Sequence, residues 1–597
     1  MYYLVHRKFS QEKSSFGKGI SSYKYLTRFM YRQKEIYMYP ALLMLWVFLF
    51  SCNNSNGPKD KQIVSDPEQM DKRAAENIKA TLDLALNNTG KIDDSIHLDL
   101  VNLVNNFYKS ADYQPAWSKK EKWAPMGDSL YQFIVHAELS GLFPTDYHFK
   151  NLQSLKDKLD NDSLKRMDAA LWTRADIMLT DGFMHIIKDL KQGRLQPDSV
   201  SLNKDSALAD NFFLTTIKEL LDKQKFTTLL NSLEPRHKGY WELKKGIKPF
   251  IDSMDRRTYT YVNYPYKKGD AKDSAFFIKT LQKRLSESGV METTGHLPDS
   301  AQLTTALIKI QKQKGLTADG KISTALIRSL NTSDVERFKR IAITLDRYKQ
   351  LPEKMPVKYI WVNLPGFYLW VIDHDTIAVE SKIICGKPDT RTPLLNSQVT
   401  DMVTYPTWTV PNSIIVKSYL PRLKSNPNYI SRIGLKLVNG KGETIDPSSI
   451  NWAKYSKGIP FKVMQASGDN NALGVIKFNF NNPYAVYLHD TNQRYLFKNA
   501  SRALSHGCVR VQDWEKLAFY IAKNDSINAP RKDSLRYTSD SIRNWIAHKV
   551  RRRIDIKNQI PLFIRYFSCE GKKGRIQFYD DIYGEDKAMR EKYFASK

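Results

Sequence analysis

The sequence predicts a multidomain α+β protein with a helical N-terminal part, a small three-helix unit and a mainly-β C-terminal domain. Three observations support this prediction. The 597 residues are too many for one core, since a domain usually holds roughly 100–200 residues. Apolar residues recur at helical spacing from residue 71 to about residue 335. Beyond Pro356, β-branched and aromatic runs replace this spacing.

The chain is strongly basic, with 92 Lys and Arg against 63 Asp and Glu and a net charge of +29. Such a balance suits nucleic acid, a membrane surface or a polyanionic polymer. We exclude nucleic acid, because the sequence has no helix-turn-helix spacing, no zinc-binding cysteine pair and no aromatic RNP motif.

Residues 1–51 are expected to be a signal region. Residues 37–50 are apolar, follow Arg32 and Lys34, and are too few to span a bilayer comfortably. The stretch that ends in Ser51-Cys52 resembles a lipoprotein box, which implies that Cys52 is lipidated and becomes the first mature residue. We therefore expect export to the periplasm or cell envelope and membrane contact through this anchor or signal. The true start codon stays open.

Residues 52–70 are polar and predict a flexible tether. Residues 71–260 predict a helical scaffold domain. Aromatics at 107–117 and 141–147 fall in expected loops and are more typical of core than of a groove. No acid pair, metal cluster or phosphate loop stands out there, so no catalytic role is assigned to this domain.

Residues 270–335 predict three short helices. Leu281 and Leu285 share one face, Leu307 and Ile310 a second, and Pro298-Asp299 is a start signal. The string LTTALIKIQKQKGLTADGKISTALIRSL resembles the peptidoglycan-binding domain of bacterial wall enzymes. The alternative is a generic three-helix bundle.

Residues 355–590 predict the mainly-β domain. The runs 359–364 and 367–372 are separated by Pro365-Gly366, a hairpin signal. Four more strand-like runs lie at 380–385, 475–480, 485–488 and 508–511.

The chemistry concentrates at Ser505-His506-Gly507-Cys508-Val509-Arg510-Val511. A cysteine acts as a nucleophile through its thiolate, so it needs a base or a positive field nearby. His489 could supply the base if the strand that ends near it lies beside the strand that begins at Cys508; His506 is the competing base. From these residues alone, an inert buried cysteine remains the alternative. Cys385 and Cys569 end apolar runs and are expected to be buried and structural.

Gly507 and Arg510, close to the thiol in the sequence, each have a property that acyl-transfer chemistry could use. Gly507 lets backbone amides approach a substrate carbonyl, as an oxyanion site requires. Arg510 alternates onto the face of Cys508 and could raise the local positive potential or bind a carboxylate.

The strings YLHDT and SHGCVRV, with VNLPGFYLWV, CGKPDTRTP, YPTWTVPNSI and ALGVIKFNF, resemble the catalytic domain of L,D-transpeptidases of the YkuD family, most closely its large YcbB-like branch. The resemblance implies a scaffold, a peptidoglycan-binding module and a catalytic domain with a capping insertion, here about 419–468. It also implies acylation of the enzyme by carbapenems.

By this resemblance Cys508 is the nucleophile, His489 is its general base, and the Gly507 and Cys508 amides form the oxyanion site. His506 then orients the loop, while Ser505 and Tyr487 supply hydrogen bonds. Acyl transfer through a thioester needs no metal or organic cofactor, and none is expected.

The resemblance implies a peptidoglycan L,D-transpeptidase that acts on tetrapeptide stems and forms 3,3 cross-links. An L,D-carboxypeptidase and a non-catalytic wall-binding protein are the alternatives. The acyl acceptor stays open among a stem amine, a D-amino acid, a protein and water, as do the oligomeric state and regulation.

Overall fold

The computed structural model describes residues 62–202, 207–264, 271–292, 295–314, 316–527 and 537–597. The predicted signal region, Cys52 and the first part of the tether lie outside these described residues. Within the described ranges, no helix has both the length and the apolar character needed to cross a membrane.

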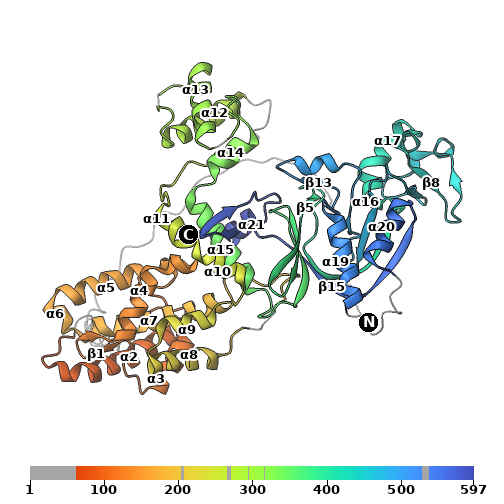
Figure 1. Cartoon of the computed structure of the whole chain (residues 1–597). Coiled ribbons are helices and arrows are strands. Elements are labelled where there is room, and N and C mark those ends of the chain that lie inside the picture. The colour runs from red at the N-terminus through yellow and green to blue at the C-terminus, as the bar shows by residue number, and fades with distance from the viewer. Residues whose placement is uncertain (1–61, 203–206, 265–270, 293–294, 315, 528–536) are drawn as a thin grey trace, which may run out of the picture. The chain divides into compact units, whose positions relative to one another are not determined.

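The N-terminal part is helical, as the sequence predicts, with one short two-stranded hairpin (Figure 1). Its elements are η1 (Pro67–Gln69), α2 (Met70–Asn87), α3 (Val101–Ser110), β1 (Ser118–Lys119), β2 (Lys122–Trp123), α4 (Pro125–Val135), η2 (Ala137–Ser140), η3 (Pro144–Asp146), α5 (Phe149–Asn161), α6 (Ser163–Arg166), α7 (Ala169–Lys191), α8 (Asp210–Lys223), α9 (Phe226–Leu233), α10 (Lys238–Lys245) and α11 (Ile247–Asp252).

Helix α7 is buried along most of its length and forms the centre of this part. Its buried Asp176 accepts hydrogen bonds from the Tyr108 hydroxyl at 2.7 Å and the Trp117 amide at 3.0 Å. A buried carboxylate requires such donors, so the loop that carries Trp117 is fixed to the helix. Tyr108, Trp117 and Tyr147 are fully buried, so these aromatics fill the core, as predicted. Tyr108 lies in α3 and not in a loop, contrary to the expectation from the sequence.

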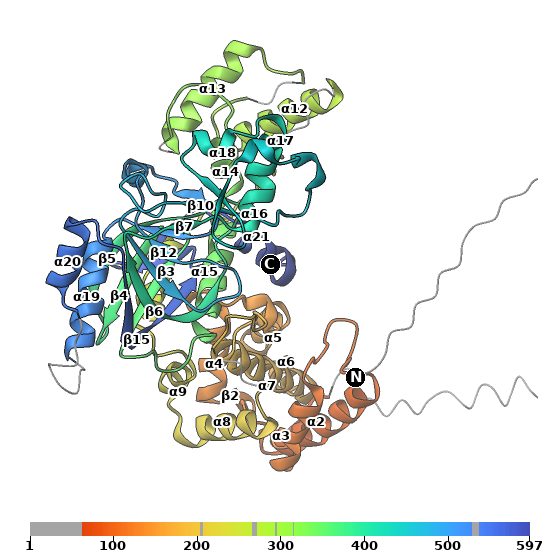
Figure 2. The same cartoon turned by 90° about the vertical axis from the view of Figure 1, so that its right-hand side faces the viewer.

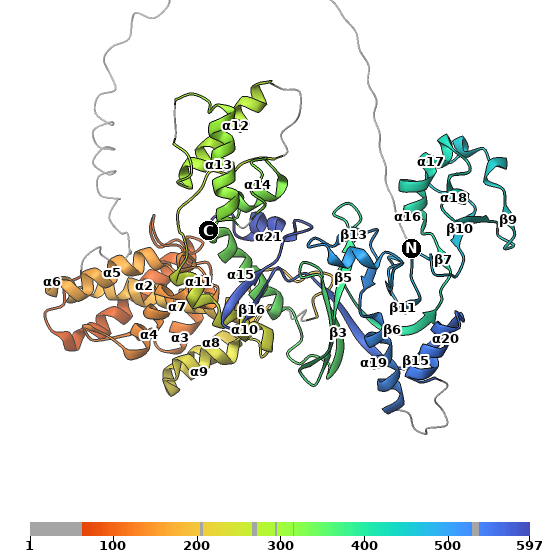
Figure 3. The same cartoon turned by 45° about the horizontal axis from the view of Figure 1, so that its top comes forward.

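The three predicted helices of residues 270–335 are present and share their own core (Figure 3). They are α12 (Ala271–Glu287), α13 (Ser300–Gln313) and α14 (Thr324–Asn331). Asp299 caps α13 by accepting from the Gln302 amide at 2.7 Å, which explains why the helix begins there. Peptidoglycan binding by this three-helix unit stays a prediction.

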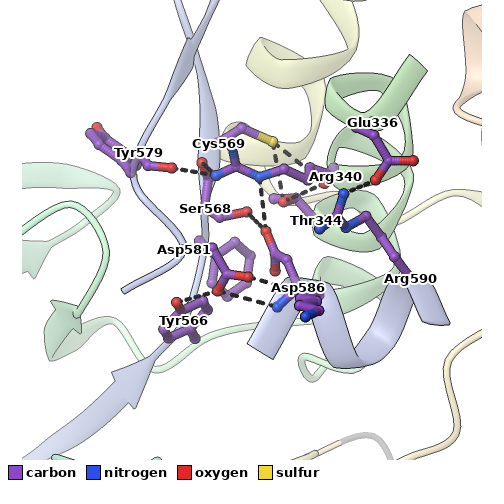
Figure 4. A network of polar contacts seen from close by, with 12 residues as sticks. Glu336, Arg340, Thr344, Tyr566, Ser568, Cys569, Tyr579, Asp581, Asp586 and Arg590 are labelled. Atoms are coloured by element: carbon purple, nitrogen blue, oxygen red, sulfur yellow. Dashed lines mark hydrogen bonds and ion pairs between the residues drawn. The ribbon is translucent and has the colours of Figure 1, made fainter. Parts of the chain in front are cut away.

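Helix α15 (Asp334–Lys349) packs against a C-terminal segment made of β16 (Cys569–Lys572), β17 (Arg575–Phe578) and α21 (Glu585–Tyr593). The buried Asp586 carboxylate accepts from Arg340 Nε at 3.0 Å and from Arg347 Nη1 at 2.7 Å. Figure 4 shows Arg340 reaching Asp586 and the two chain segments that meet there. We call these contacts the Asp586 network; they join α15 to the end of the chain.

The mainly-β domain is a sheet whose pairing closes on itself. The pairs run β4–β5–β14–β12–β11–β6–β15–β3–β4, and β13 adds to β5. The strands are β3 (Lys358–Asn363), β4 (Tyr368–Asp373), β5 (Thr376–Gly386), β6 (Leu395–Thr404), β11 (Ile476–Phe480), β12 (Leu488–His489), β13 (Ala503–Ser505), β14 (Val509–Val511) and β15 (Arg552–Arg565). A closed ring leaves few unpaired edges and holds short strands such as β12 and β14 in fixed register.

The predicted hairpin at Pro365-Gly366 joins β3 to β4. The runs predicted at 475–480 and 508–511 contain β11 and β14, the run at 380–385 lies within the longer β5, and the run at 485–488 shares only Leu488 with β12. Three strands that the sequence did not indicate, β6, β13 and β15, complete the sheet. Helices α19 (Trp514–Ile527) and α20 (Ser539–Ala547) pack side by side on it (Figure 2). The short helix η7 (Arg494–Lys498) follows β12.

The capping segment is a small unit with its own four-stranded sheet, in the order β7-β10-β8-β9. It begins at Trp408, eleven residues before the predicted start at 419, because β7 pairs with β10 at its far end. Its core includes Leu420, Leu423, Leu437 and Val463. Its elements are β7 (Trp408–Thr409), α16 (Asn412–Ile414), η4 (Ile415–Tyr419), α17 (Leu420–Ser425), α18 (Tyr429–Arg432), β8 (Lys436–Val438), β9 (Thr444–Ile445), η5 (Pro447–Ser449), η6 (Trp452–Lys454) and β10 (Lys462–Gln465).

Candidate active site

The turn from Ser505 to Cys508 connects β13 to β14 and carries the candidate nucleophile. The Ser505 hydroxyl donates to the Cys508 carbonyl at 2.6 Å and accepts from the Gly507 amide at 3.1 Å. Gly507 has φ +121°, a backbone conformation that side-chain-bearing residues rarely adopt. A Cβ placed there would meet no atom closer than 3.6 Å, so the turn needs glycine for its conformation and not for space.

The amides of the turn differ in their availability. The Gly507 amide is engaged by Ser505, whereas the Cys508 amide makes no hydrogen bond to any described residue. Of the two amides predicted for the oxyanion site, the Cys508 amide is therefore the one with a free N–H.

A second segment, residues 387–392, lies against this turn. The Lys387 amide and the Thr390 hydroxyl both donate to the Ser505 carbonyl, at 2.9 and 3.1 Å. The Thr392 hydroxyl donates to the Gly507 carbonyl at 2.8 Å. The turn is thus bonded at Ser505 and at Gly507, on both sides of His506.

Strand β12 and the residue before it place His489 and Tyr487 next to the segment that carries Cys508. It pairs in parallel with β14, with His489 opposite Arg510, and the Val509 amide donates to the Tyr487 carbonyl at 3.1 Å. Because side chains alternate along strands, Tyr487, His489, Cys508 and Arg510 project from one face of the sheet. The Tyr487 and His489 rings contact edge to face, with centroids 5.6 Å apart.

Burial and charge act in opposite directions on the thiol. Burial raises the pKa of Cys508, while hydrogen bonds from Tyr487 and the positive charges of Lys477 and Arg510 lower it. The free protein therefore holds Cys508 mainly as a thiol at neutral pH, with groups in place that favour the thiolate once a base takes the proton.

The two candidate bases lie in different surroundings. His489 is 4% exposed, and its Nδ1 makes no well-formed hydrogen bond. Burial and the charge of Arg510 lower its pKa to about 3, against the opposite effect of backbone hydrogen bonds with Asp490 and Leu473. An imidazole that is neutral at pH 7 and has an unpartnered nitrogen can accept a proton. His506 is exposed at the surface, and its pKa is lowered by partial burial and by the charges of Lys387 and Arg510.

His506 lines a cavity of about 330 Å³ between the 387–391 segment and the cap. The cap contributes Ser413, Ile414, Lys417 and Ser418. Lys387, Arg391 and Lys417 outnumber the acidic Asp389 in its lining, so the cavity next to the turn suits an anionic group.

Sequence reasoning missed several groups that act on the site. Lys477 pairs with His489 across β11 and β12, and its ammonium lies 3.9 Å from the Tyr487 ring centroid. The sequence did contain a sign of this position, because Lys477 stands between Ile476 and Phe478 in a strand. Those two residues are buried, so the Lys477 side chain lies on the face of the sheet away from the core. Thr392 contacts the turn from more than a hundred residues away in the chain, and Tyr583 contacts Thr392 from still farther along. Neither residue lies in a local pattern that reveals its contact.

The other two described cysteines are buried, as predicted. Burial raises the pKa of Cys385 and of Cys569 to about 12, which makes both poor nucleophiles. Among the described residues, no group of three His, Cys, Asp or Glu side chains is arranged to hold a metal ion.

Comparison with known families matches residues 357–528 to the model described as the L,D-transpeptidase catalytic domain (YkuD) and residues 102–247 to the scaffold domain model. A Haemophilus influenzae protein named "Putative L,D-transpeptidase" is 33% identical over 251 residues, which cover 42% of this chain and 49% of that protein. The chain thus spans about half the length of this curated relative.

Three solved structures align at low TM-scores. The Ldtfm–avibactam carbamoyl enzyme has a TM-score of 0.16 at 13% identity, over 36% of this chain and 51% of that chain. A mutant of the Enterococcus faecium L,D-transpeptidase gives 0.15 at 13% identity, over 36% and 52%. An L,D-transpeptidase from Xylanimonas cellulosilytica gives 0.14 at 12% identity, over 48% and 92%. Scores this low support no further conclusion.

Proposed function

We propose that this chain, which carries a YkuD L,D-transpeptidase catalytic domain at residues 357–528 and a scaffold domain at residues 102–247, is a peptidoglycan L,D-transpeptidase. It would cross-link stem peptides through a thioester on Cys508. The observation that supports this most is the pairing of β12 with β14, which puts the neutral His489 on the same sheet face as the thiol.

In the first half-reaction, His489 accepts the Cys508 proton, and the thiolate attacks the carbonyl carbon of the L,D amide in a tetrapeptide stem. The carbonyl oxygen becomes an oxyanion and accepts a hydrogen bond from the Cys508 amide. The C–N bond breaks, His489 returns the proton to the departing nitrogen, and D-alanine leaves. A thioester then links Cys508 to the stem.

In the second half-reaction, a side-chain amine of another stem attacks the thioester carbon. His489 takes a proton from this amine, and the C–S bond breaks. The proton then passes to the thiolate, which regenerates Cys508 and leaves a 3,3 cross-link. The basic cavity beside His506 supports a substrate that carries carboxylates.

The purified protein should convert tetrapeptide muropeptides into 3,3-linked dimers, separated by chromatography and identified by mass. Tripeptides without dimers would instead show water as the acceptor and an L,D-carboxypeptidase. If neither product forms, intact mass with a carbapenem tests for a catalytic thiol: a single adduct that Cys508→Ala removes supports the nucleophile. No adduct with the wild type leaves the non-catalytic wall-binding alternative.

The remaining parts of the proposal concern location and wall contact. We propose that the protein is exported and anchored in the cell envelope through Cys52, and that the three-helix unit of residues 270–335 binds peptidoglycan. Loss of membrane association in Cys52→Ala would support the anchor. Separately, a variant that lacks residues 270–335 should stay in the soluble fraction after incubation with isolated sacculi, which would support peptidoglycan binding by the three-helix unit.

A further inference from the structure

The side chain of Tyr583 links the C-terminal segment to the active-site turn. It is 5% exposed, and it lies beyond the residues that match the catalytic-domain model. Its hydroxyl donates to the Gly386 carbonyl at 2.8 Å and accepts from the Thr392 amide at 3.1 Å. The hydroxyl therefore acts as donor at one end of the 386–392 loop and as acceptor at the other.

Thr392 carries the link onward to the turn. Its hydroxyl accepts from the Gly386 amide at 2.9 Å and donates to the Gly507 carbonyl at 2.8 Å. Gly386 is closely enclosed here, since a Cβ on it would lie 2.1 Å from the Thr390 carbonyl oxygen. Tyr583, Gly386 and Thr392 thus form a small set of reciprocal hydrogen bonds that ends at Gly507.

The Gly507 carbonyl and the Cys508 amide belong to the same peptide unit. A peptide unit is planar, so a hydrogen bond that fixes its C=O also fixes the direction of its N–H. This N–H makes no hydrogen bond to any residue that the structure describes, and it is the one that the proposed function assigns to the oxyanion. Hydrogen bonding to the carbonyl also polarises the unit and strengthens the N–H as a donor.

The backbone of Tyr583 is fixed by hydrogen bonds within the C-terminal segment. Its amide donates to the Tyr566 hydroxyl at 3.0 Å, and that hydroxyl donates to Asp581 at 2.5 Å. Asp581 in turn accepts from the amide of Asp586 at 3.3 Å, which connects Tyr583 to the Asp586 network (Figure 4). The Arg391 guanidinium lies over the Tyr583 ring, 5.4 Å from its centroid.

We propose that Tyr583 is a positioning residue for acyl transfer: through Thr392 it orients the Gly507–Cys508 peptide so that the Cys508 N–H points at the oxyanion. This role rests on the proposed function of Cys508. It assigns to the C-terminal segment a part in the reaction in addition to its part in folding.

The test is Tyr583→Phe, which removes only the hydroxyl, with Tyr579→Phe as the control. Tyr579 lies in the same segment, but its hydroxyl donates to Glu570 and not toward the turn. Acylation of Cys508 by a carbapenem should slow by about 10- to 100-fold in Tyr583→Phe, because loss of one oxyanion donor typically costs 100- to 1000-fold and a misaligned donor costs less. Tyr579→Phe should acylate as the wild type does.

Alkylation by iodoacetamide separates positioning from general damage, since it uses the thiolate without an oxyanion. Its rate and pH profile should be the same in Tyr583→Phe and in the wild type. Thr392→Val should reproduce the acylation defect, Thr392→Ser should restore it, and Tyr583→Phe should add little to Thr392→Val. The proposal would be overturned if Tyr583→Phe were acylated at the wild-type rate. It would also be overturned if Tyr583→Phe lost alkylation rate by the same factor as acylation rate.

A measurement that needs no activity completes the test. In protein labelled with ¹⁵N-cysteine, the Cys508 amide signal is identified by its loss in Cys508→Ala. Tyr583→Phe should shift this signal and speed its hydrogen exchange, while the Cys569 signal stays in place. If the wild type is never acylated, the proposed function fails; an unmoved Cys508 signal overturns the role of Tyr583 in either case.

Discussion

Lys477 lies directly opposite His489 in the antiparallel pairing of β11 and β12. On the other side of His489, the parallel pairing with β14 puts Arg510 in the same row. Two cations therefore flank the imidazole, and both lower its pKa, while both also favour the Cys508 thiolate. This row of side chains therefore keeps the His489 imidazole neutral and makes the Cys508 thiol easier to ionise.

Replacing Lys477 with methionine should raise the pKa of the Cys508 thiol, because one of the two positive charges near it is lost. We expect alkylation by iodoacetamide at pH 7 to slow by about three- to tenfold, and the difference to close at pH values above both thiol pKa values. Lys462→Met, at an exposed position of β10, is the control. If Lys477→Met and the wild type were alkylated at equal rates at pH 7, Lys477 would have no effect on the Cys508 thiol.

The pH dependence of alkylation should show no thiolate plateau at neutral pH. The pKa of His489 is about 3 and that of Cys508 is raised, so the free protein holds a neutral imidazole and a thiol. The alkylation rate should rise steadily from pH 6 to pH 9. A flat rate between pH 5 and pH 8 would instead indicate a preformed thiolate–imidazolium pair and contradict this assignment.

His489 should also make folding stability depend on pH. The unfolded chain binds a proton near pH 6.5, whereas the folded chain does so only near pH 3. Between these values the unfolded state holds more protons, so the His489 contribution to stability falls as the pH falls from 6.5 toward 3. The thermal midpoint of the wild type should drop more over this range than that of His489→Gln.

Of the two histidines, His489 should matter far more for acylation. A general base typically contributes 100- to 10,000-fold, so His489→Ala should slow carbapenem acylation by about that factor. His506→Ala should cost less than about tenfold, because its exposed ring lines the neighbouring cavity. Equal losses, or the reverse order, would reject His489 as the base.

Gly507→Ala should damage the reaction more than the fold. A Cβ on Gly507 would make only ordinary van der Waals contacts, the nearest at 3.6 Å, but the φ of +121° is unfavourable for alanine and costs about 1–3 kcal/mol or moves the peptide. We expect a folded protein whose acylation is slowed by about tenfold or more. The control is Gly574→Ala in the β16–β17 turn, where φ is +71° and a Cβ would meet no atom within 4 Å. This variant should lose a little stability and keep its acylation rate.

Asp586→Asn should destabilise the protein by about 3–5 kcal/mol, because it leaves the buried Arg340 and Arg347 without their counter-charge. Asp580→Asn breaks an exposed pair with Arg328 and should cost about 0–1 kcal/mol. Urea denaturation of both variants measures the difference. A loss below about 1 kcal/mol in Asp586→Asn would show that the Asp586 network contributes little.

The parts predicted from the sequence are those with a local signal. Helical periodicity, the Pro365-Gly366 turn and the short spacing between His489 and Cys508 each involve neighbouring residues or adjacent strands. By contrast, β15 was not predicted, because it carries Pro561 and an irregular register between Asp555 and Ile560 that interrupt the strand pattern. The cap was predicted to begin too late, since β7 is only two residues long.

The contacts of Tyr583 could not be predicted for a different reason. Its hydroxyl meets Thr392 from 191 positions away in the chain, and nothing in the composition near either residue marks the pair. The same holds for Lys477, whose role depends on which strand becomes the neighbour of β12. Sequence patterns indicated the candidate residues Cys508, His489 and Arg510, whereas the positions of Lys477 and Tyr583 near them depend on tertiary contacts.

The closed ring of strands has a consequence for the order in which the chain is made. Strand β15 lies between β6 and β3, so the ring lacks a member until residue 565 has been synthesised, well after Cys508. Residues 566–586, which include Tyr583 and so hold the 386–392 loop, come later still. A nascent chain therefore contains Cys508 before it contains β15 and Tyr583, and the surroundings of the thiol are complete only after residue 586 has been synthesised.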